Sequence, residues 1–384
     1  MTNEPRDTGL SAAAWAAVYV GVAAATLPTV LPVMVGVLAD KLAFGNVRAG
    51  YVAAANMGGV ALGSLICAVL ARRWPWRTLI RAGTATLIGA NILSMWAAAF
   101  PSMAISRSIS GLGEGVVQAV CYAAMGRSGQ PARALGLYLA GQGLTGAIGM
   151  AAIPTVVARL GWPWLFVLVS AVALPCFWLA LPIQTLARAV PVEAVDAPAA
   201  GRRSIYALSG ILIFFIGMSA VWSFVERMGQ AKGIGLAQLS IALSASSLAN
   251  VLGALFVAIL AHRLSDISGV IAGSCMVLCG LTGLVVSHDW RAYLAAVSVF
   301  FFAWGFFYPF QFRLLTRTDA DNGITVLLPL MTGGGFTAGP ALGGLLLTAG
   351  GPLPLCIFGA VCVAASTAAA MHLYFRCRGN GKNT

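Results

Sequence analysis

Charged side chains are scarce in this sequence: Asp, Glu, Lys and Arg together make up 9% of its 384 residues, whereas 59% are hydrophobic. A soluble globular protein has about 25% charged residues, so this chain has too few to cover a surface that faces water. Disorder is excluded too, because disordered chains are rich in charge and poor in apolar residues. A polytopic membrane protein remains.

Acidic residues and histidines are also few, at 11 and 3. The three histidines are far apart in the sequence, and there is no Ser-His-Asp arrangement, HExxH motif or nucleotide-binding loop. These absences argue against an enzyme, an ATP-driven pump, a metal site and a cofactor. The eight cysteines form no CxxC pair and lie mostly in apolar runs, which indicates small buried hydrophobic residues.

Apolar runs fill the rest of the chain. A membrane-spanning helix needs about 20 apolar residues, and twelve runs of roughly that length occur, six on each side of the polar stretch 186–204. The sequence therefore predicts an all-α integral membrane fold, with twelve transmembrane helices in two six-helix pseudo-symmetric bundles. The bundles comprise residues 1–185 and 205–384, with 186–204 as a cytoplasmic central loop and a short cytoplasmic tail. The runs are 12–37, 50–71, 78–98, 102–124, 134–157, 163–185, 205–226, 238–260, 268–287, 291–313, 323–347 and 352–375.

The distribution of positive charge predicts the orientation. With the N-terminus inside, 16 of the 23 Lys and Arg residues fall in cytoplasmic segments, six in outer loops and one, Arg107, in a span. This excess follows the positive-inside rule and places both termini in the cytoplasm of a multi-pass protein of the cell membrane. We interpret the net charge of +12 as contact with lipid headgroups rather than with nucleic acid. We expect a monomer, and no cleavage site follows the polar N-terminus.

The two halves resemble each other in sequence. Leu62 to Arg73 and Leu252 to Arg263 match at seven of twelve positions, at a constant offset of 190 residues. A parallel repeat of six helices is typical of transporter halves related by an axis along the membrane normal.

Four features together resemble the major facilitator superfamily. They are the repeat with its polar central loop, and three motifs. Arg107, Gly111 and Gly113 are similar to the family's R-x-x-x-G-x-G, and residues 161–166 (GWPWLF) to its G-W-R-W-x-F. Residues 333–344, which include Gly339 and Pro340, resemble the G-x-x-x-G-P-x-x-G-G of the family's antiporters, although those carry it in helix 5 and this chain has it in helix 11. The resemblance implies a secondary transporter that works by alternating access.

One motif departs from the family. The family's loop between helices 2 and 3 reads G-x-x-x-D-R-x-G-R-R, but Arg72 stands here in the place of the aspartate, followed by Arg73. His262 stands at the matching place in the second half. The basic part of this gating motif is kept, while any role of the acid is in doubt.

Arg107 and Glu114 are the most informative residues, because ionisable groups within a membrane normally have a task. Seven residues apart on one helix, they point the same way, about 10 Å apart along the axis. Arg107 can hold a carboxylate through two hydrogen bonds, and Glu114, near the midplane, can take up a proton. The spacing also resembles the anion–cation symporter branch of the family, which often adds an acid in helix 1 that this chain lacks. The alternative is a static charge pair that holds the helix in place.

Single polar residues in other spans complete the candidate site. We expect Gln118 to continue the Arg107–Glu114 stripe, and Gln142, Gln311 and Asn56 to contact substrate, although each also suits a hydrogen bond between helices. Glu226, beside Arg227 at the end of a span, is expected at the outer membrane–water boundary as a solvated charge, with a role in proton movement as the alternative.

These observations predict proton-coupled secondary transport of a small organic solute. Organic-anion (carboxylate) symport is favoured by Arg107 and Glu114, whereas proton-driven efflux of hydrophobic or cationic compounds is favoured by the glycine motif around Gly339 and Pro340. A non-transporting membrane sensor is the alternative of another class, and the short tails argue against it.

Overall fold

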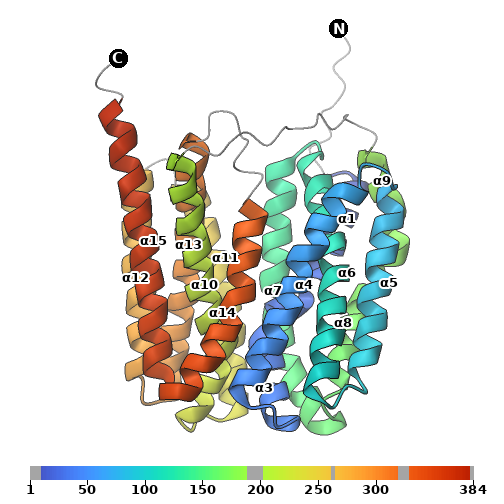
Figure 1. The fold of residues 1–384 in the computed structure, drawn as a ribbon, viewed down its shortest axis with the longest axis horizontal. Coiled ribbons are helices and arrows are strands. Elements are labelled where there is room, and N and C mark those ends of the chain that lie inside the picture. The colour runs from blue at the N-terminus through green and yellow to red at the C-terminus, as the bar shows by residue number, and fades with distance from the viewer. Residues whose placement is uncertain (1–9, 188–201, 261–263, 319–327, 381–384) are drawn as a thin grey trace.

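The structure, a computed structural model, describes residues 10–187, 202–260, 264–318 and 328–380. The described residues form helices and no strand, so the all-α prediction is confirmed. The start of the first helix and the end of the last lie at the same end of the molecule, which we call the terminal end (Figure 1). The opposite end is called the far end.

The helices run roughly along one direction (Figure 1). In chain order they are α1 (Ala12–Ala24), α2 (Thr26–Thr29), α3 (Leu31–Lys41), α4 (Gly45–Leu70), α5 (Trp76–Ser94), α6 (Phe100–Gly126), α7 (Pro131–Leu160), α8 (Trp164–Ala173), α9 (Cys176–Ala187), α10 (Arg202–Ala231), α11 (Leu236–Leu260), α12 (Asp266–Val286), α13 (Trp290–Thr318), α14 (Leu328–Gly350) and α15 (Pro352–Asn380).

Nine segments of the described chain are helical, long and apolar enough to cross a membrane. They are Gly45–Leu70, Arg133–Leu160, Trp164–Ala187, Leu208–Ala231, Leu236–Val257, Asp266–Val286, Trp290–Leu314, Leu330–Gly350 and Pro352–Phe375. Outside this set, α6 carries Arg107 and Glu114 in its middle, α5 begins with Arg77 and Arg81, and residues 12–41 form three short helices. The chain is a multi-pass integral membrane protein.

Prolines interrupt the first apolar segment. Because Pro28 and Pro32 lack an N–H, the carbonyl groups of Ala24 and Pro28 have no donor four residues later. The helix accordingly ends at Ala24, continues as the single turn α2 and resumes at Leu31. The break is buried, so the freed carbonyl of Ala24 needs a partner from another helix.

Glycines bring the backbones of α4 and α6 into contact. Gly63 lies against the carbonyl oxygen of Leu112, and Gly115 lies against that of Val60. A Cβ atom at either glycine would overlap the backbone of the other helix. Small residues of this kind allow close packing of helices in membranes, where the hydrophobic effect contributes little to association.

The same pair of contacts occurs between α11 and α13. Gly253 lies against the carbonyl oxygen of Phe302, and Gly305 lies against that of Asn250. Each of these residues is numbered 190 higher than its counterpart in α4 or α6, which is the offset of the sequence repeat. The repeat is therefore a repeat of packing as well as of sequence.

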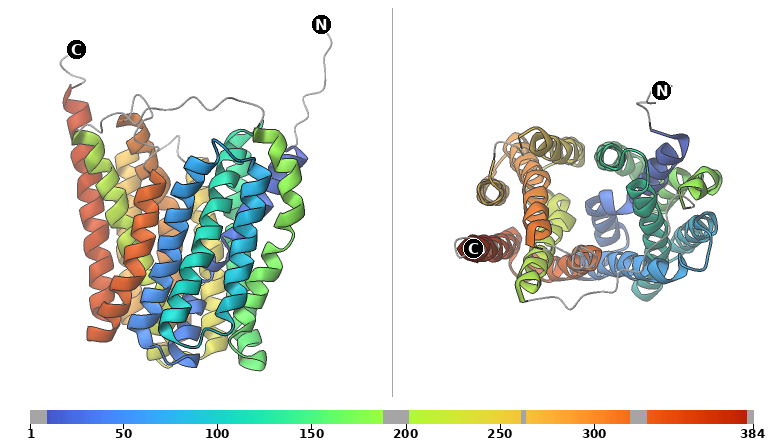
Figure 2. Two further views of the ribbon diagram at one scale, coloured as in Figure 1. Left: turned by 45° about the vertical axis from the view of Figure 1, so that its right-hand side comes forward. Right: turned by 90° about the horizontal axis from the view of Figure 1, so that it is seen from above.

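Three helix pairs join the earlier part of the chain to the later part: α4 with α14, α7 with α11, and α3 with α10. In the end-on view α4 and α14 lie side by side (Figure 2). Gly50 of α4 contacts the carbonyl oxygen of Pro340, and the Ser244 hydroxyl of α11 donates to the carbonyl of Ala147 in α7 at 2.8 Å.

Candidate functional site

Arg107 lies in the middle of α6 and is fully buried. Its Nη2 donates to Asn91 Oδ1 at 2.7 Å and to Ser94 Oγ at 2.8 Å, and its Nε donates to Ser94 Oγ at 3.1 Å. The guanidinium also lies 4.5 Å from the centre of the Phe166 ring. The positive charge is thus enclosed by α5 and α8, and neutral groups surround it.

Glu114 lies two turns further along α6 and is also buried. Its Oε2 accepts a hydrogen bond from Asn56 Nδ2 at 3.1 Å, and its Oε1 accepts one from Ser110 Oγ at 3.0 Å. Asn56 belongs to α4, at the point where Gly111 allows α4 and α6 to meet. The sequence placed Asn56 among the substrate contacts, whereas the structure places it against Glu114.

Two polar residues connect Arg107 with Glu114. Asn91 Oδ1 accepts from Arg107 at 2.7 Å and faces Ser110 Oγ at 3.4 Å, and the same hydroxyl lies 3.0 Å from Glu114 Oε1. Within the described residues, Arg107 and Glu114 make no direct ion pair. The two ionisable groups are therefore connected by hydrogen bonds through Asn91 and Ser110, and not by direct contact.

Two atoms of this network have no hydrogen-bond partner within the described residues. They are Arg107 Nη1 and Asn56 Oδ1, both fully buried. Since an unpaired buried polar group is costly, these atoms mark positions where another arrangement of the network, or a bound group, would form further hydrogen bonds.

Gln118 does not continue the network. Its Nε2 donates to the carbonyl oxygen of Ala24 at 3.3 Å, which is the carbonyl that Pro28 leaves without a donor. In this structure Gln118 supports the break in the first segment, an interaction that spacing along α6 alone does not indicate.

Gln142 belongs to a second polar group, on α7 and the terminal-end half of α6. Its Nε2 donates to the hydroxyl of Tyr138 at 2.9 Å, and the hydroxyl of Tyr122 donates to the same oxygen at 3.2 Å. Tyr138 is buried, but Tyr122 is about half exposed.

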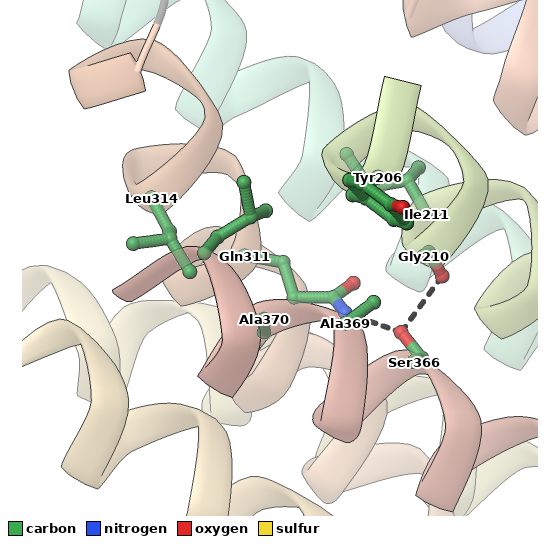
Figure 3. Close-up of a pocket in the computed structure, with 9 residues that line it drawn as sticks. Tyr206, Gly210, Ile211, Gln311, Leu314, Ser366, Ala369 and Ala370 are labelled. Carbon is green, nitrogen blue, oxygen red and sulfur yellow. Dashed lines mark hydrogen bonds between the residues drawn. The ribbon is translucent and has the colours of Figure 1, made fainter. Parts of the chain in front are cut away.

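Gln311 lies elsewhere, between α10, α13 and α15. Its Nε2 donates to Ser366 Oγ, which donates to the carbonyl of Gly210 at 2.7 Å (Figure 3). A small pocket beside it is lined by Tyr206, Leu314 and other residues (Figure 3). Gln311 is buried, and its amide bonds within the later part of the chain rather than to Glu114 or Gln142. The structure therefore does not bring Gln311 into one site with the other candidates.

Of the candidate gating residues, three lie at close contacts between helices and two are exposed arginines in a turn. Gly111 lies against the carbonyl of Asn56, and Gly339 lies against the Ser219 hydroxyl of α10, so both permit close helix packing. Pro340 is inside α14, and its carbonyl meets Gly50 of α4. Arg72 and Arg73 are exposed in the turn between α4 and α5 and form no ion pair within the described residues.

The start of α5 and the start of α12 are each held by an arginine from the helix that follows, but through different partners. Arg127, at the end of α6, lies 4.8 Å from the centre of the Trp76 ring at the start of α5. In the later half, Arg313 of α13 pairs with Asp266 at 3.0 Å, and Asp266 is numbered 190 above Trp76. An arginine thus ties together the same two helix ends in both halves, with an aromatic ring in one and a carboxylate in the other. His262 lies outside the described residues.

An aromatic cluster occupies the part of α13 that corresponds to the polar part of α6. Trp304 and Tyr308 are numbered 190 above Glu114 and Gln118. Trp304 stacks on Phe336 of α14 with centroids 5.9 Å apart, and Tyr308 lies 5.1 Å from Phe215 of α10. Equivalent positions of the repeat thus carry an ionisable carboxyl group in one half and aromatic rings in the other.

The sequence patterns did not single out Asn91, Ser94 or Ser110, and they included Phe166 only as the last residue of the 161–166 motif. Serine is common in membrane helices, and its role depends on which helix it faces. A buried arginine without an acid nearby signals that neutral acceptors must surround it, but the signal does not name them.

Both the sequence and the fold match known proteins. A family model described as Major Facilitator Superfamily matches residues 13–323. No curated protein matches the sequence. Among solved structures, the "Crystal structure of nucleoside transporter NupG" matches with a TM-score of 0.75 and 10% sequence identity, over 94% of this chain and 98% of that chain. At this identity the likeness is one of fold.

Proposed function

We propose that this chain couples the transport of a small organic anion to the movement of protons. The chain belongs to the major facilitator superfamily, so it is a transporter and not an enzyme. Secondary transport of a small solute follows from the family and the fold. The single observation that carries the rest is the buried chain of hydrogen bonds from Arg107 to Glu114.

The proposed layout is twelve crossings in two bundles, residues 1–185 and 205–384, joined by the cytoplasmic loop 186–204. The glycine contacts that recur at an offset of 190 support two equivalent halves. The terminal end is assigned to the cytoplasm on the count of Lys and Arg, and the far end to the outside. Alternating access then consists of rocking one bundle against the other, and Pro340 lies at a contact between the bundles, against Gly50 of α4. Gly111 and Gly339 hold helices together within each bundle, and Arg72 and Arg73 lie in the exposed turn between α4 and α5.

Charge favours an anionic substrate when Glu114 is protonated. In that state Arg107 is a buried positive charge whose hydrogen-bond partners are neutral. A buried charge without a counterion is costly, so a carboxylate near this region relieves the cost. When Glu114 is deprotonated the network already has a negative charge, and an anion gains less. Proton and anion therefore favour each other, which is the basis of symport.

Ser110 supplies a physical connection between the two groups. Its hydroxyl has one hydrogen, but it faces two acceptors, Glu114 Oε1 at 3.0 Å and Asn91 Oδ1 at 3.4 Å. A deprotonated Glu114 holds that hydrogen. A protonated Glu114 donates its own hydrogen to Ser110, whose hydrogen then turns to Asn91, so that Ser110 and Arg107 both donate to the amide oxygen.

The equivalent parts of α6 and α13 suggest the shape of the substrate. α6 offers Glu114 and the Arg107 network, while α13 offers Trp304 and Tyr308 at equivalent positions. We therefore favour an amphipathic acid with a flat apolar part, whose carboxylate turns towards α6. The aromatic cluster also supports the second candidate, proton-driven efflux of hydrophobic cations, because cations bind over aromatic rings.

Proteoliposomes with a pH-sensitive dye inside test these alternatives. Aromatic carboxylates, aliphatic carboxylates, hydrophobic cations and nucleosides are added outside in turn, the last because the matched structure is that of a nucleoside transporter. Symport predicts acidification of the interior with aromatic carboxylates, and a smaller effect with aliphatic ones. Proton movement in the opposite sense, driven by cations, would assign the protein to efflux. Transport of nucleosides or carboxylates without proton movement would overturn the coupling.

A further inference from the structure

A second buried carboxyl group lies at the far end, away from the Arg107–Glu114 network. Glu226, near the end of α10, is only 6% exposed, so its expected place as a solvated charge is wrong. The reason is that α3 packs over it: Glu226 Oε1 lies where a Cβ on Gly36 would be 2.7 Å away. A larger residue at position 36 would require the Glu226 carboxyl group to move.

The charged neighbours of Glu226 have other partners. Arg227 pairs with Asp40 of α3 and donates to Asn46 Oδ1 of α4 at 3.1 Å. It also donates to Gln230 Oε1 at 2.8 Å. Glu226 Oε1 receives one hydrogen bond, from Gln230 Nε2 at 3.0 Å, and Oε2 receives none within the described residues.

Among the described residues of the other helices, no cation forms an ion pair with Glu226. On α13, the Tyr293 hydroxyl donates to the carbonyl of Val225. From α7 and α11 the pocket around the carboxyl is lined by apolar residues such as Met150 and Leu239, with Ser240 as the polar one. On α3, Asp40 adds a second negative charge nearby and Lys41 ends the helix. A deprotonated Glu226 would therefore be a buried anion close to another acid, and its cationic neighbour Arg227 is already paired with that acid, Asp40.

The pocket also offers little that would stabilise such an anion. It is small and mostly apolar, so a water molecule within it would find few polar partners. A proton needs no additional space. The geometry favours a neutral carboxylic acid over a carboxylate.

We propose that Glu226 is a second proton-binding site, loaded when α3 closes over α10 at the far end and emptied when these helices separate. In the closed arrangement the proton removes the cost of a buried charge. In the open arrangement the carboxyl meets water and releases the proton, which passes to bulk water on that side. Closure of this end therefore takes up one proton from outside.

The inference rests on the alternating-access part of the proposed function, but not on the substrate or on Glu114. By linkage, the closed state that binds one more proton becomes less populated as pH rises. The ratio of closed to open molecules changes by up to about tenfold per pH unit in the range where the two states differ in protonation.

Spin-label distances between the far ends test this site. Labels at Ala98→Cys, between α5 and α6, and His288→Cys, between α12 and α13, occupy exposed positions, in a background without Cys275, Cys279 and Cys377. In the wild-type sequence, raising the pH should shift the population towards the longer distance. Glu226→Gln, a neutral side chain of the same shape, should remain closed at all pH values. Glu114→Gln should leave a pH-dependent shift.

A second variant acts through geometry. Gly36→Ala places a methyl group against the Glu226 carboxyl and should raise the open fraction at a given pH. A pH-dependent shift that persists in Glu226→Gln and vanishes in Glu114→Gln would overturn the inference while leaving proton coupling intact. A wild-type distance that changes with substrate but not with pH would also overturn it. Far ends that never separate would overturn both this inference and alternating access.

Discussion

Replacing Gln118 distinguishes a substrate contact from a structural one. Gln118 Nε2 donates to the carbonyl of Ala24, which Pro28 leaves without its helical donor. In Gln118→Met the side chain keeps its length but loses the donor, so the carbonyl remains buried and unpaired. Hydrogen bonds between membrane helices contribute about 0.6 kcal/mol on average and about 1.7 kcal/mol at most. The 3.3 Å distance is long for an N–H···O bond, which lowers the contribution of the bond itself. Since the substitution also leaves a buried carbonyl unpaired, we expect a total loss of about 1 kcal/mol.

A second substitution removes the need for Gln118. In Pro28→Ala the N–H of residue 28 can bond the Ala24 carbonyl within the helix, so Gln118→Met should then cost less than about 0.5 kcal/mol. The assay is the thermal unfolding midpoint of the four proteins in detergent, followed by transport in liposomes. Gln142→Met is the matched control, because its partner is the Tyr138 hydroxyl and Pro28→Ala should not rescue it. Loss of transport in both backgrounds, with unchanged midpoints, would refute the structural role and make Gln118 a substrate contact.

Three further substitutions test the packing and the electrostatics. Gly305→Ala should lower the unfolding midpoint, because overpacking against α11 costs about 1–3 kcal/mol. The control Gly89→Ala should not lower it, since no atom lies within 4 Å of a Cβ at that position. Equal midpoints for the two variants would contradict the packing repeat. Phe166→Leu removes the ring 4.5 Å from the buried guanidinium and should cost about 0.5–2 kcal/mol, and an unchanged midpoint would show that the ring contact contributes nothing. The Asp289 carboxylate caps the start of α13: it accepts hydrogen bonds from the backbone N–H groups of Ala292 and Arg291, which hold its pKa below the ordinary value. Asp289→Ala should therefore lower the unfolding midpoint at pH 7, but not at a pH below that lowered pKa. A midpoint change that does not depend on pH would contradict the capping role.

The membrane class, the helical fold and the repeat follow from the sequence because they depend on composition and on a fixed offset. Apolar runs of about 20 residues have few alternatives to a spanning helix. The glycines at positions 63 and 253 lie in the matching stretches of the repeat, and the structure places both at backbone contacts. Local patterns are sufficient for such features.

The partners of polar residues do not follow in the same way. Arg107 and Glu114 are correctly placed on one face of a helix, but their link through Asn91 depends on how α5 packs against α6. Gln311 is also a polar residue in a span, yet it lies between α13 and α15, away from the network. Periodicity gives the direction of a side chain relative to its own helix, while the neighbour it meets is a property of the tertiary arrangement.

Glu226 illustrates the same limit of local patterns. Its position beside Arg227 at a helix end indicates a solvated pair, and the neighbouring charge suggests a partner. In the structure Arg227 turns to Asp40 and Asn46, on other helices, and Glu226 is covered by α3. The residue packed against it is Gly36, which stands 190 positions earlier, at the repeat offset. The offset marks the two as equivalent positions of the halves, but it does not show that they lie in contact.

Proton coupling through Glu114 is tested most directly by comparing substrate exchange with proton-driven uptake in Glu114→Gln. In liposomes loaded with the transported anion, exchange with labelled anion at equal concentrations measures alternating access without net proton movement. We predict that the variant exchanges substrate but no longer accumulates it when the outside is made more acidic. Accumulation that still follows the pH gradient in Glu114→Gln, at the wild-type ratio of protons to substrate, would contradict the assignment of Glu114 as the proton carrier.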